Sequence, residues 1–212
     1  MNFLLELVTG PEIEPVTLAE LKASIRTFAS STDEDDLLTA LIQSAREWVE
    51  GETGRVLVDQ TWKLTVDTDR VVQTDARDGQ IYYSTPIPTK VGEILLQKSP
   101  ALAILSFISV DATTGVETAV TAGTYELREA DSKWPRIVAL DGSTWSSGTF
   151  RITFRAGYSD QTGSPQDDRS VIPNRFKQAM MLYAEAIYDR DPALIDVAKT
   201  LIKNERCNLQ FA

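Results

Sequence analysis

The stretch that decides the fold is Asp33–Gly54, DEDDLLTALIQSAREWVEGETG. Its apolar residues recur with a period of about 3.6, which predicts a helix with one apolar stripe and one charged face. Acidic residues crowd the first turn, where the helix dipole favours negative charge, and Gly54 is a candidate left-handed cap. The predicted stripe consists of Leu37, Leu38, Leu41, Ile42, Ala45, Trp48 and Val49. So amphipathic a helix needs a packing partner in this chain or in a neighbouring copy.

Helical sequence occurs near both ends of the chain. Val16–Phe28 opens with the capping-box pattern Thr17-Leu18-Ala19-Glu20 and is expected to form a hairpin with the Asp33–Gly54 helix. Pro173 suits the first turn of a third helix, and Asp191-Pro192 supplies a cap and a first-turn proline for a fourth. The apolar positions expected in these last two helices are Phe176, Met180, Tyr183, Ile187, Leu194, Ile195, Ala198, Leu201 and Ile202.

Between these helical ends the apolar period changes to two, which is typical of half-buried strands. Val58–Val66 alternates in this way, and Gly148–Tyr158 gives the strongest strand signal. Met1–Val8 is short, lacks a basic region and carries Glu6, so we expect an N-terminal strand or arm instead of a signal peptide. Further short strands are expected at 81–83, 91–97, 102–110, 116–120, 124–128 and 136–140, with a polar loop at 67–79.

The predicted fold class is therefore α+β. A helical bundle formed by the N- and C-terminal helices carries an inserted antiparallel β-sandwich or small β-barrel region. The expected domains are a helical hairpin over residues 1–55, a β-rich domain over 56–158, a polar linker over 159–172, and C-terminal helices with a tail over 173–212.

Composition excludes several classes of function. The 212 residues carry a net charge of −10, which argues against binding nucleic acid through its phosphates and against docking on anionic membranes. The chain has no histidine and a single cysteine, Cys207, so it lacks Ser–His and Cys–His pairs, His-ligated metals and a disulfide framework. No apolar run approaches the roughly 20 residues that span a bilayer.

Motifs that carry chemistry are absent from the sequence. There is no phosphate-binding loop, dinucleotide fingerprint, nucleophile elbow or zinc-protease pattern. Asp67-Thr68-Asp69 could hold a cation, but a solvated turn is the better interpretation of so short a match. Glu47 and Glu50 are expected to form a solvent face with Arg46, and Arg151 and Arg155 to pair with surface acids. No catalytic, cofactor-binding or metal-binding residue is assigned.

Several strings, taken in order, resemble the head–tail connector (adaptor) proteins of long-tailed bacteriophages and gene-transfer particles. No single string is specific, but their order is, and it covers nearly the whole chain. The strings are Glu14–Lys22 (EPVTLAELK), Asp35–Leu38 with Leu41-Ile42, Ala45–Glu50 (AREWVE), Thr53–Leu57 (TGRVL), Gln60–Trp62 (QTW), Val110-Asp111, Thr124-Tyr125, Phe154–Tyr158 (FRAGY), Ile172-Pro173 with Lys177–Ala179, and Tyr188–Arg190.

The resemblance implies a structural virion protein without a catalytic site or cofactor. It would be made in the host bacterial cytoplasm and form a ring of about twelve copies in the neck, at the head–tail interface. Its implied partners are the portal protein, stopper or tail proteins and other copies of itself. Viral DNA would pass through the ring during ejection without sequence-specific binding, and no membrane is involved.

The resemblance also implies where partners dock. The family docks on the portal largely through its C-terminal segment, and the charged face of the central helix is left for a neighbouring subunit. The candidate portal-docking residues are Leu194, Leu201, Ile202, Asn208, Leu209 and Phe211, and the candidate inter-subunit residues are Arg46, Glu47 and Glu50.

Two alternative functions stay open. The first is another neck component, such as a stopper or tail-completion protein. The second is a carboxylate-dependent hydrolase with a β-rich domain, which predicts a deep pocket whose acids have shifted pKa values.

Overall fold

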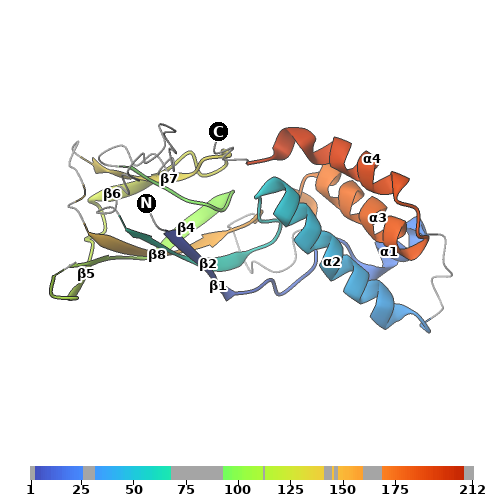
Figure 1. Cartoon of the computed structure of the whole chain (residues 1–212), viewed down its shortest axis with the longest axis horizontal. Coiled ribbons are helices and arrows are strands. Elements are labelled where there is room, and N and C mark those ends of the chain that lie inside the picture. The colour runs from blue at the N-terminus through green and yellow to red at the C-terminus, as the bar shows by residue number, and fades with distance from the viewer. Residues whose placement is uncertain are drawn as a thin grey trace, which may run out of the picture. The chain divides into compact units, whose positions relative to one another are not determined.

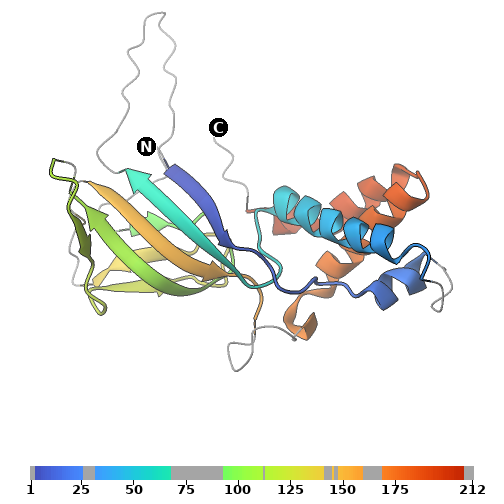
Figure 2. The same ribbon diagram turned by 90° about the horizontal axis from the view of Figure 1, so that it is seen from below.

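The structure is a computed structural model that describes residues 3–25, 32–67, 93–111, 113–140, 145, 148–159 and 169–207. The chain forms two compact units (Figures 1 and 2). One is helical and combines Gly10–Asp59 with Gly157–Asn208; the other contains the strands, from Met1–Thr9 and Gln60–Ala156. The strand expected at 81–83, the loop at 67–79 beyond Asp67, and most of the linker lie outside the described residues.

The helical unit contains four α-helices, drawn from both ends of the chain. They are α1 (Leu18–Ser24), α2 (Asp35–Thr53), α3 (Asn174–Tyr188) and α4 (Ala193–Ile202), with short 3-10 helices η2 (Arg169–Val171) and η3 (Lys203–Glu205). The predicted packing of N-terminal helices with C-terminal helices is confirmed: α3 packs against α1, α2 and α4 (Figure 1). Of the described helices, none has the length and apolar character needed to cross a membrane.

Local signals set the ends of these helices. Thr17 and Glu20 form the predicted capping box: Thr17 N donates to Glu20 Oε2 at 2.6 Å, and Glu20 N donates to Thr17 Oγ1 at 3.1 Å. Gly54 ends α2 in the left-handed region, with φ of 71°, as expected for a residue without a Cβ. The N-cap of α4 is Pro192, one residue after the predicted Asp191, and Asp191 Oδ1 accepts a hydrogen bond from Ala193 N, in the first turn, at 3.0 Å.

The core of the helical unit lies between α2 and α3. Trp48 of α2 stacks on Tyr183 of α3 with ring centroids 4.5 Å apart, and Tyr188 Oη donates to Glu34 Oε2 at 2.8 Å. Burial of this apolar surface is the main favourable term that holds the two chain halves together. The buried members of the core include Leu21, Leu38, Leu41, Ile42, Ala45, Val49, Phe176, Ala179, Met180, Ala184, Ala198 and Ile202.

Two residues assigned to the apolar stripes are not buried. Leu37 is 52% exposed and Ile187 is 46% exposed. Each falls at the border of its stripe, next to buried Leu38 in one helix and buried Ala186 in the other. Because successive helical residues are separated by about 100° around the axis, a residue at the border of a stripe can face away from the core while its neighbour is buried.

The β-rich unit contains two antiparallel sheets. A five-stranded sheet has the order β1-β2-β8-β4-β5, and a three-stranded sheet has the order β3-β7-β6 (Figure 2). The strands are β1 (Phe3–Thr9), β2 (Gln60–Asp67), β3 (Glu93–Leu95), β4 (Ala101–Val110), β5 (Glu117–Ala119), β6 (Tyr125–Arg128), β7 (Arg136–Ala139) and β8 (Thr149–Ala156). Among the described strands, no pairing closes the two sheets into the small barrel that was one of the two expected forms.

The register of β2 and β8 explains the core of this unit. Leu64 pairs with Ile152, and Val66 pairs with Phe150; all four side chains are buried. Residues two apart on a strand share a face, so this register points both apolar rows to the same side. Phe107 of the larger sheet contacts Tyr125 of the smaller one, with ring centroids 5.0 Å apart, so the two sheets share an aromatic core.

Gly157, which follows β8, requires a residue without a side chain. Its φ is 133°, and a Cβ at this position would collide with the Val58 carbonyl group and lie 2.8 Å from Asp59 N. Both obstacles are backbone atoms, which cannot rotate away.

We therefore expect Gly157→Ala to destabilise the helical unit by about 2 kcal/mol or more, through backbone strain and collision. Gly51→Ala is the matched control, because Gly51 lies inside α2 and an added Cβ there would have no other atom within 4 Å. It should stabilise the protein by roughly 0.5–1 kcal/mol. Denaturant unfolding of both variants checks this; equal effects would contradict the close approach at Gly157.

Candidate docking and assembly surfaces

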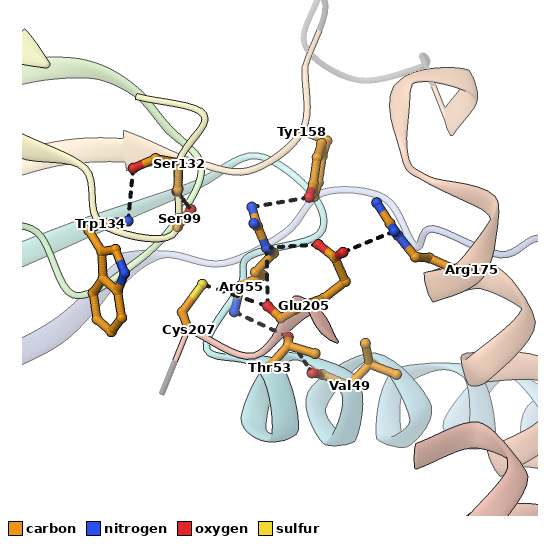
Figure 3. Close-up of polar contacts among 10 residues, drawn as sticks. All are labelled: Val49, Thr53, Arg55, Ser99, Ser132, Trp134, Tyr158, Arg175, Glu205 and Cys207. Atoms are coloured by element: carbon orange, nitrogen blue, oxygen red, sulfur yellow. Dashed lines mark hydrogen bonds and ion pairs between the residues drawn. The ribbon is translucent and has the colours of Figure 1, made fainter. Parts of the chain in front are cut away.

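A buried ionic cluster holds the C-terminal segment against the end of α2 (Figure 3). Arg55 Nε donates to the Glu205 carbonyl oxygen at 3.4 Å and lies 3.6 Å from Glu205 Oε2. Arg55 Nη1 donates to Tyr158 Oη at 3.4 Å, and Arg175 Nη1 lies 2.9 Å from Glu205 Oε1. We call Arg55, Tyr158, Arg175 and Glu205 the Arg55 cluster.

The charges of the Arg55 cluster are stable in a buried position only because they are paired. Arg55 is 7% exposed, and a buried charge is costly unless it is paired and hydrogen-bonded. The Glu205 carboxylate sits between two guanidinium groups, so it is compensated from both sides. Burial raises the pKa of the Tyr158 phenol, with Arg55 opposing that rise, so Tyr158 stays neutral and keeps its hydroxyl proton.

Backbone bonds continue this attachment to Cys207. Cys207 N donates to the Thr53 carbonyl at 2.6 Å. The Thr53 hydroxyl donates to the Val49 carbonyl at 2.7 Å and accepts from Arg55 N at 3.2 Å, as Figure 3 shows. Arg206 also pairs with Glu52. The last turn of α2 therefore carries the end of the described chain.

The predicted portal-docking residues fall in different environments. Leu194 and Leu201 are half-buried on α4. Ile202 is fully buried and belongs to the core of the helical unit, so it is part of the fold. Asn208, Leu209 and Phe211 lie outside the described residues.

The predicted inter-subunit residues lie around a second ionic cluster. Arg46 Nε is 2.9 Å from Glu14 Oε2, and Arg46 Nη1 is 3.2 Å from Glu50 Oε2. Glu50 Oε1 also accepts a hydrogen bond from Leu57 N at 2.8 Å. Arg46 and Glu50 are each 8% exposed.

The expectation that Arg46, Glu47 and Glu50 form a solvent face is therefore wrong for Arg46 and Glu50. Their charges are used inside the chain, because a long-range partner, Glu14, approaches the same side of α2. Of the three, Glu47 keeps an exposed carboxylate. The contact of Arg46, Glu47 and Glu50 with a neighbouring subunit stays a prediction.

Two glutamates of this unit have opposite pKa shifts. Burial raises the pKa of Glu14 above its usual value of 4.5, with the nearby Arg46 guanidinium opposing the rise. The backbone N–H of Thr17, which donates to its carboxylate, lowers the pKa of Glu20 below 4.5. Folding thus disfavours the ionised form of Glu14 and favours that of Glu20.

The remaining candidate sites have simple structural explanations. Arg151 pairs with Glu117 across the larger sheet, as expected for a surface pair. Within the part of the chain that the structure describes, no group of three or more His, Cys, Asp or Glu residues could hold a metal ion. Thr68 and Asp69 of the candidate cation motif lie outside that part.

The Arg55 cluster was not predicted from the sequence. Arg55 directly follows the glycine cap of α2, where an arginine marks the end of the helix without identifying a partner. Glu205 lies 150 residues further on, and nothing in its local sequence distinguishes it from other surface acids.

Comparison with known proteins finds a family model that matches part of this sequence and solved structures with a similar fold. Residues 15–97 match the family model described as "Phage gp6-like head-tail connector protein". That stretch contains the capping box, all of α2 and Arg55. A search of curated proteins gives no match.

Three solved structures of gene transfer agent (GTA) particles contain chains of similar fold. One is the neck of an empty GTA particle computed with C6 symmetry, with a TM-score of 0.70, 24% identity, and coverage of 96% of this chain and 95% of that one. A chain in the virion of the native particle has a TM-score of 0.69 and 25% identity, with coverage of 95% of this chain and 94% of that one. A chain in the neck of the native particle computed with C12 symmetry has a TM-score of 0.64 and 23% identity, with coverage of 96% of this chain and 94% of that one.

The match to the family model covers less than half of the chain, so it shows a similarity to phage gp6-like head–tail connector proteins over residues 15–97, beside a fold shared with chains of GTA particles.

We expect Arg55→Ala to destabilise the helical unit by about 3–5 kcal/mol, because it leaves a buried carboxylate without one of its two guanidinium partners. Arg151→Ala is the matched control; its pair with Glu117 is exposed on both sides, so the loss should be about 0–1 kcal/mol. Thermal and denaturant unfolding compare the two. Similar losses would show that the Arg55 cluster is not a structural anchor.

The opposite pKa shifts predict opposite pH profiles for two glutamine variants. Because folding lowers the pKa of Glu20, its ionic contribution to stability is present above pH 4.5 and is lost as pH falls through its lowered pKa. Glu20→Gln should therefore cost most near neutral pH and least in acid.

Glu14→Gln should behave in the reverse way. Folding raises the Glu14 pKa, so the native state holds more protons, and stability falls as pH rises from 4.5 through the raised pKa. The variant should therefore gain stability relative to wild type as pH increases through that window. Unfolding curves at a series of pH values measure both differences, and profiles of the same sign would refute the assignment.

Proposed function

We propose that this protein is an adaptor of the virion neck, a head–tail connector that forms a ring of about twelve copies between the portal and the tail. The observation that carries the proposal is the likeness to chains in two GTA neck structures over 96% of this chain. The match of residues 15–97 to the connector family supports it independently. The ring would give DNA a conduit and later neck proteins a docking platform.

The helical unit supplies a firm base for docking on the portal. Its C-terminal segment is attached to α2 through the Arg55 cluster and through the bond from Cys207 N to the Thr53 carbonyl. We therefore place portal docking in the C-terminal part of the sequence, at Asn208, Leu209 and Phe211 and at the half-buried Leu194 and Leu201 of α4. Ile202 supports this part from inside the core.

The acidic composition suits a channel through which DNA moves. A net charge of −10 per copy weakens attraction to phosphates, whose neutralisation by Lys and Arg supplies most sequence-independent affinity for DNA. A ring wall of this kind would guide the genome without retaining it.

A stopper or tail-completion protein is the second candidate. Stopper and tail-completion proteins also occupy the neck. The family match therefore supports a neck protein more strongly than it supports a particular position between the portal and the tail. Cryo-electron microscopy of the assembled neck separates them: an adaptor contacts the portal directly, whereas a stopper lies one layer further toward the tail. A map without this chain in the neck would overturn the proposal.

Removal of Asn208–Ala212 should abolish or weaken attachment to the portal while leaving the helical unit folded. The expectation follows because the described attachment of the C-terminal segment to α2, through the Arg55 cluster and Cys207, is kept in the shortened protein. Binding to purified portal, measured by pull-down and electron microscopy, is the readout. The control replaces the same five residues with a Gly/Ser sequence of equal length, which should fail equally.

A longer truncation after Arg190 should behave differently. It removes Ala198 and Ile202 from the core as well as Glu205 from the Arg55 cluster, so it should also lower the unfolding temperature of the helical unit. The β-rich unit should keep its strand signal.

If protein lacking Asn208–Ala212 still decorates portals normally, the docking role of the tail is wrong.

A further inference from the structure

Strand β1 is an edge strand with an unusual composition. It pairs with β2 on one side and has no strand on its other side among the described residues. Leu5 and Leu7 lie on the same face as the buried Leu64 of β2, Leu4 lies on the opposite face, and Val8 lies at the register shift between Leu7 and Thr9; Leu4, Leu7 and Val8 are at least 50% exposed. The strand thus exposes four apolar side chains, those of Phe3, Leu4, Leu7 and Val8.

Such a pattern is typical of a strand that is covered on both sides. Edge strands usually carry charges that prevent pairing with other chains. The single charge of β1, Glu6, forms an ion pair with Lys63 of the adjacent strand at 3.0 Å. The paired charge therefore opposes strand addition at the open edge only weakly.

The opposite edge of the same sheet is also incomplete. β4 pairs with β8 with register shifts between Ala101 and Ala103 and between Ile104 and Ser106, and β5 covers β4 only at Ile108–Val110. The stretch Leu102–Ser106 therefore has no strand partner on that side within the described residues. It carries no charge, and Leu105 is exposed. One sheet thus presents two open edges, one without charge and one whose single charge, Glu6, is paired with Lys63.

Ring symmetry determines which edges can meet. Copies in a ring of about twelve are related by a rotation of about 30°, so strand directions are nearly preserved between neighbours. β1, β2, β8 and β4 alternate in direction, so β1 runs opposite to β4. When β1 of one copy meets β4 of the next, the two strands are therefore antiparallel.

We propose that β1 of each copy pairs with Leu102–Ser106 of β4 in the next copy, so that the five-stranded sheets continue around the ring. The proposal rests on the proposed ring function and adds the surface through which neighbours join. A second copy of this chain is the fitting occupant because each copy supplies both edges, as a head-to-tail interface requires. Copies of charge −10 repel each other, which favours contact through segments without unpaired charge.

Lysine at exposed edge positions tests the pairing. We would supply Leu4→Lys/Val8→Lys, Leu105→Lys and wild-type protein to particles that lack the gene, and count necks that contain the ring. Each edge variant should reduce ring-containing necks about tenfold or more, since charged edges oppose strand pairing. Leu37→Lys is the matched control, because Leu37 of α2 is also an exposed leucine, and it should stay near the wild-type level.

Cysteine crosslinking gives a second, positive readout. In a Cys207→Ser background, Leu4→Cys would be combined in turn with Ala103→Cys and Leu105→Cys, which cover neighbouring registers on β4. Mild oxidation of assembled necks should yield a ladder of covalently linked subunits for at least one combination. Leu4→Cys combined with Leu37→Cys should give none.

The outcomes separate this inference from the function it rests on. If wild-type protein is missing from the neck, the proposed function fails. If wild-type rings form, edge-lysine variants assemble normally and no edge pair crosslinks, the strand pairing is wrong and the function stands. Circular dichroism of each purified variant confirms that the substitutions leave the protein folded, as expected for exposed side chains.

Discussion

The rest of the structure depends on the pairing of β2 with β8. These strands lie more than 80 residues apart in sequence, and their register ends with Gln60 opposite Ala156. The chain leaves the sheet on both strands at this point, where Val58 and Gly157 come into close contact. The two halves of the helical unit therefore start side by side, although the whole β-rich region separates them in sequence. A slip of one residue would turn Phe150, Ile152 and Phe154 away from their core and also separate Val58 from Gly157.

The two ionic clusters of the helical unit serve the same end. Arg46 joins α2 to Glu14, in the segment before α1, and Arg55 joins the end of α2 to Glu205, behind α4. Helix α2 is thus fastened at two places to segments that precede and follow it. Apolar packing supplies most of the stability, but it is not directional. Buried charges need particular partners, and we infer that they select one arrangement of these segments.

Periodicity and capping made much of this fold predictable, because both are local. The Thr17–Glu20 capping box, the glycine cap of α2 and the alternation in β8 are each written within a few neighbouring residues. The burial of Arg46 and Glu50 was not predictable in this way, since it depends on Glu14 and Leu57 arriving from elsewhere in the chain. The Arg55 cluster was not predictable for the same reason, because Glu205 lies 150 residues from Arg55. For function, the order of weak strings along the chain was more informative than any single residue.

The separation of the helical halves has a consequence during synthesis. The apolar stripe of α2 leaves the ribosome long before its main partner, because Phe176 follows Val49 by more than 120 residues. At the usual 5–20 residues per second, the stripe waits on the order of ten seconds for α3. During that interval Leu38, Leu41 and Ile42 have only α1 to cover them. The nascent chain is therefore a natural client for chaperones, and its yield in the host should depend on translation speed through the β-rich region.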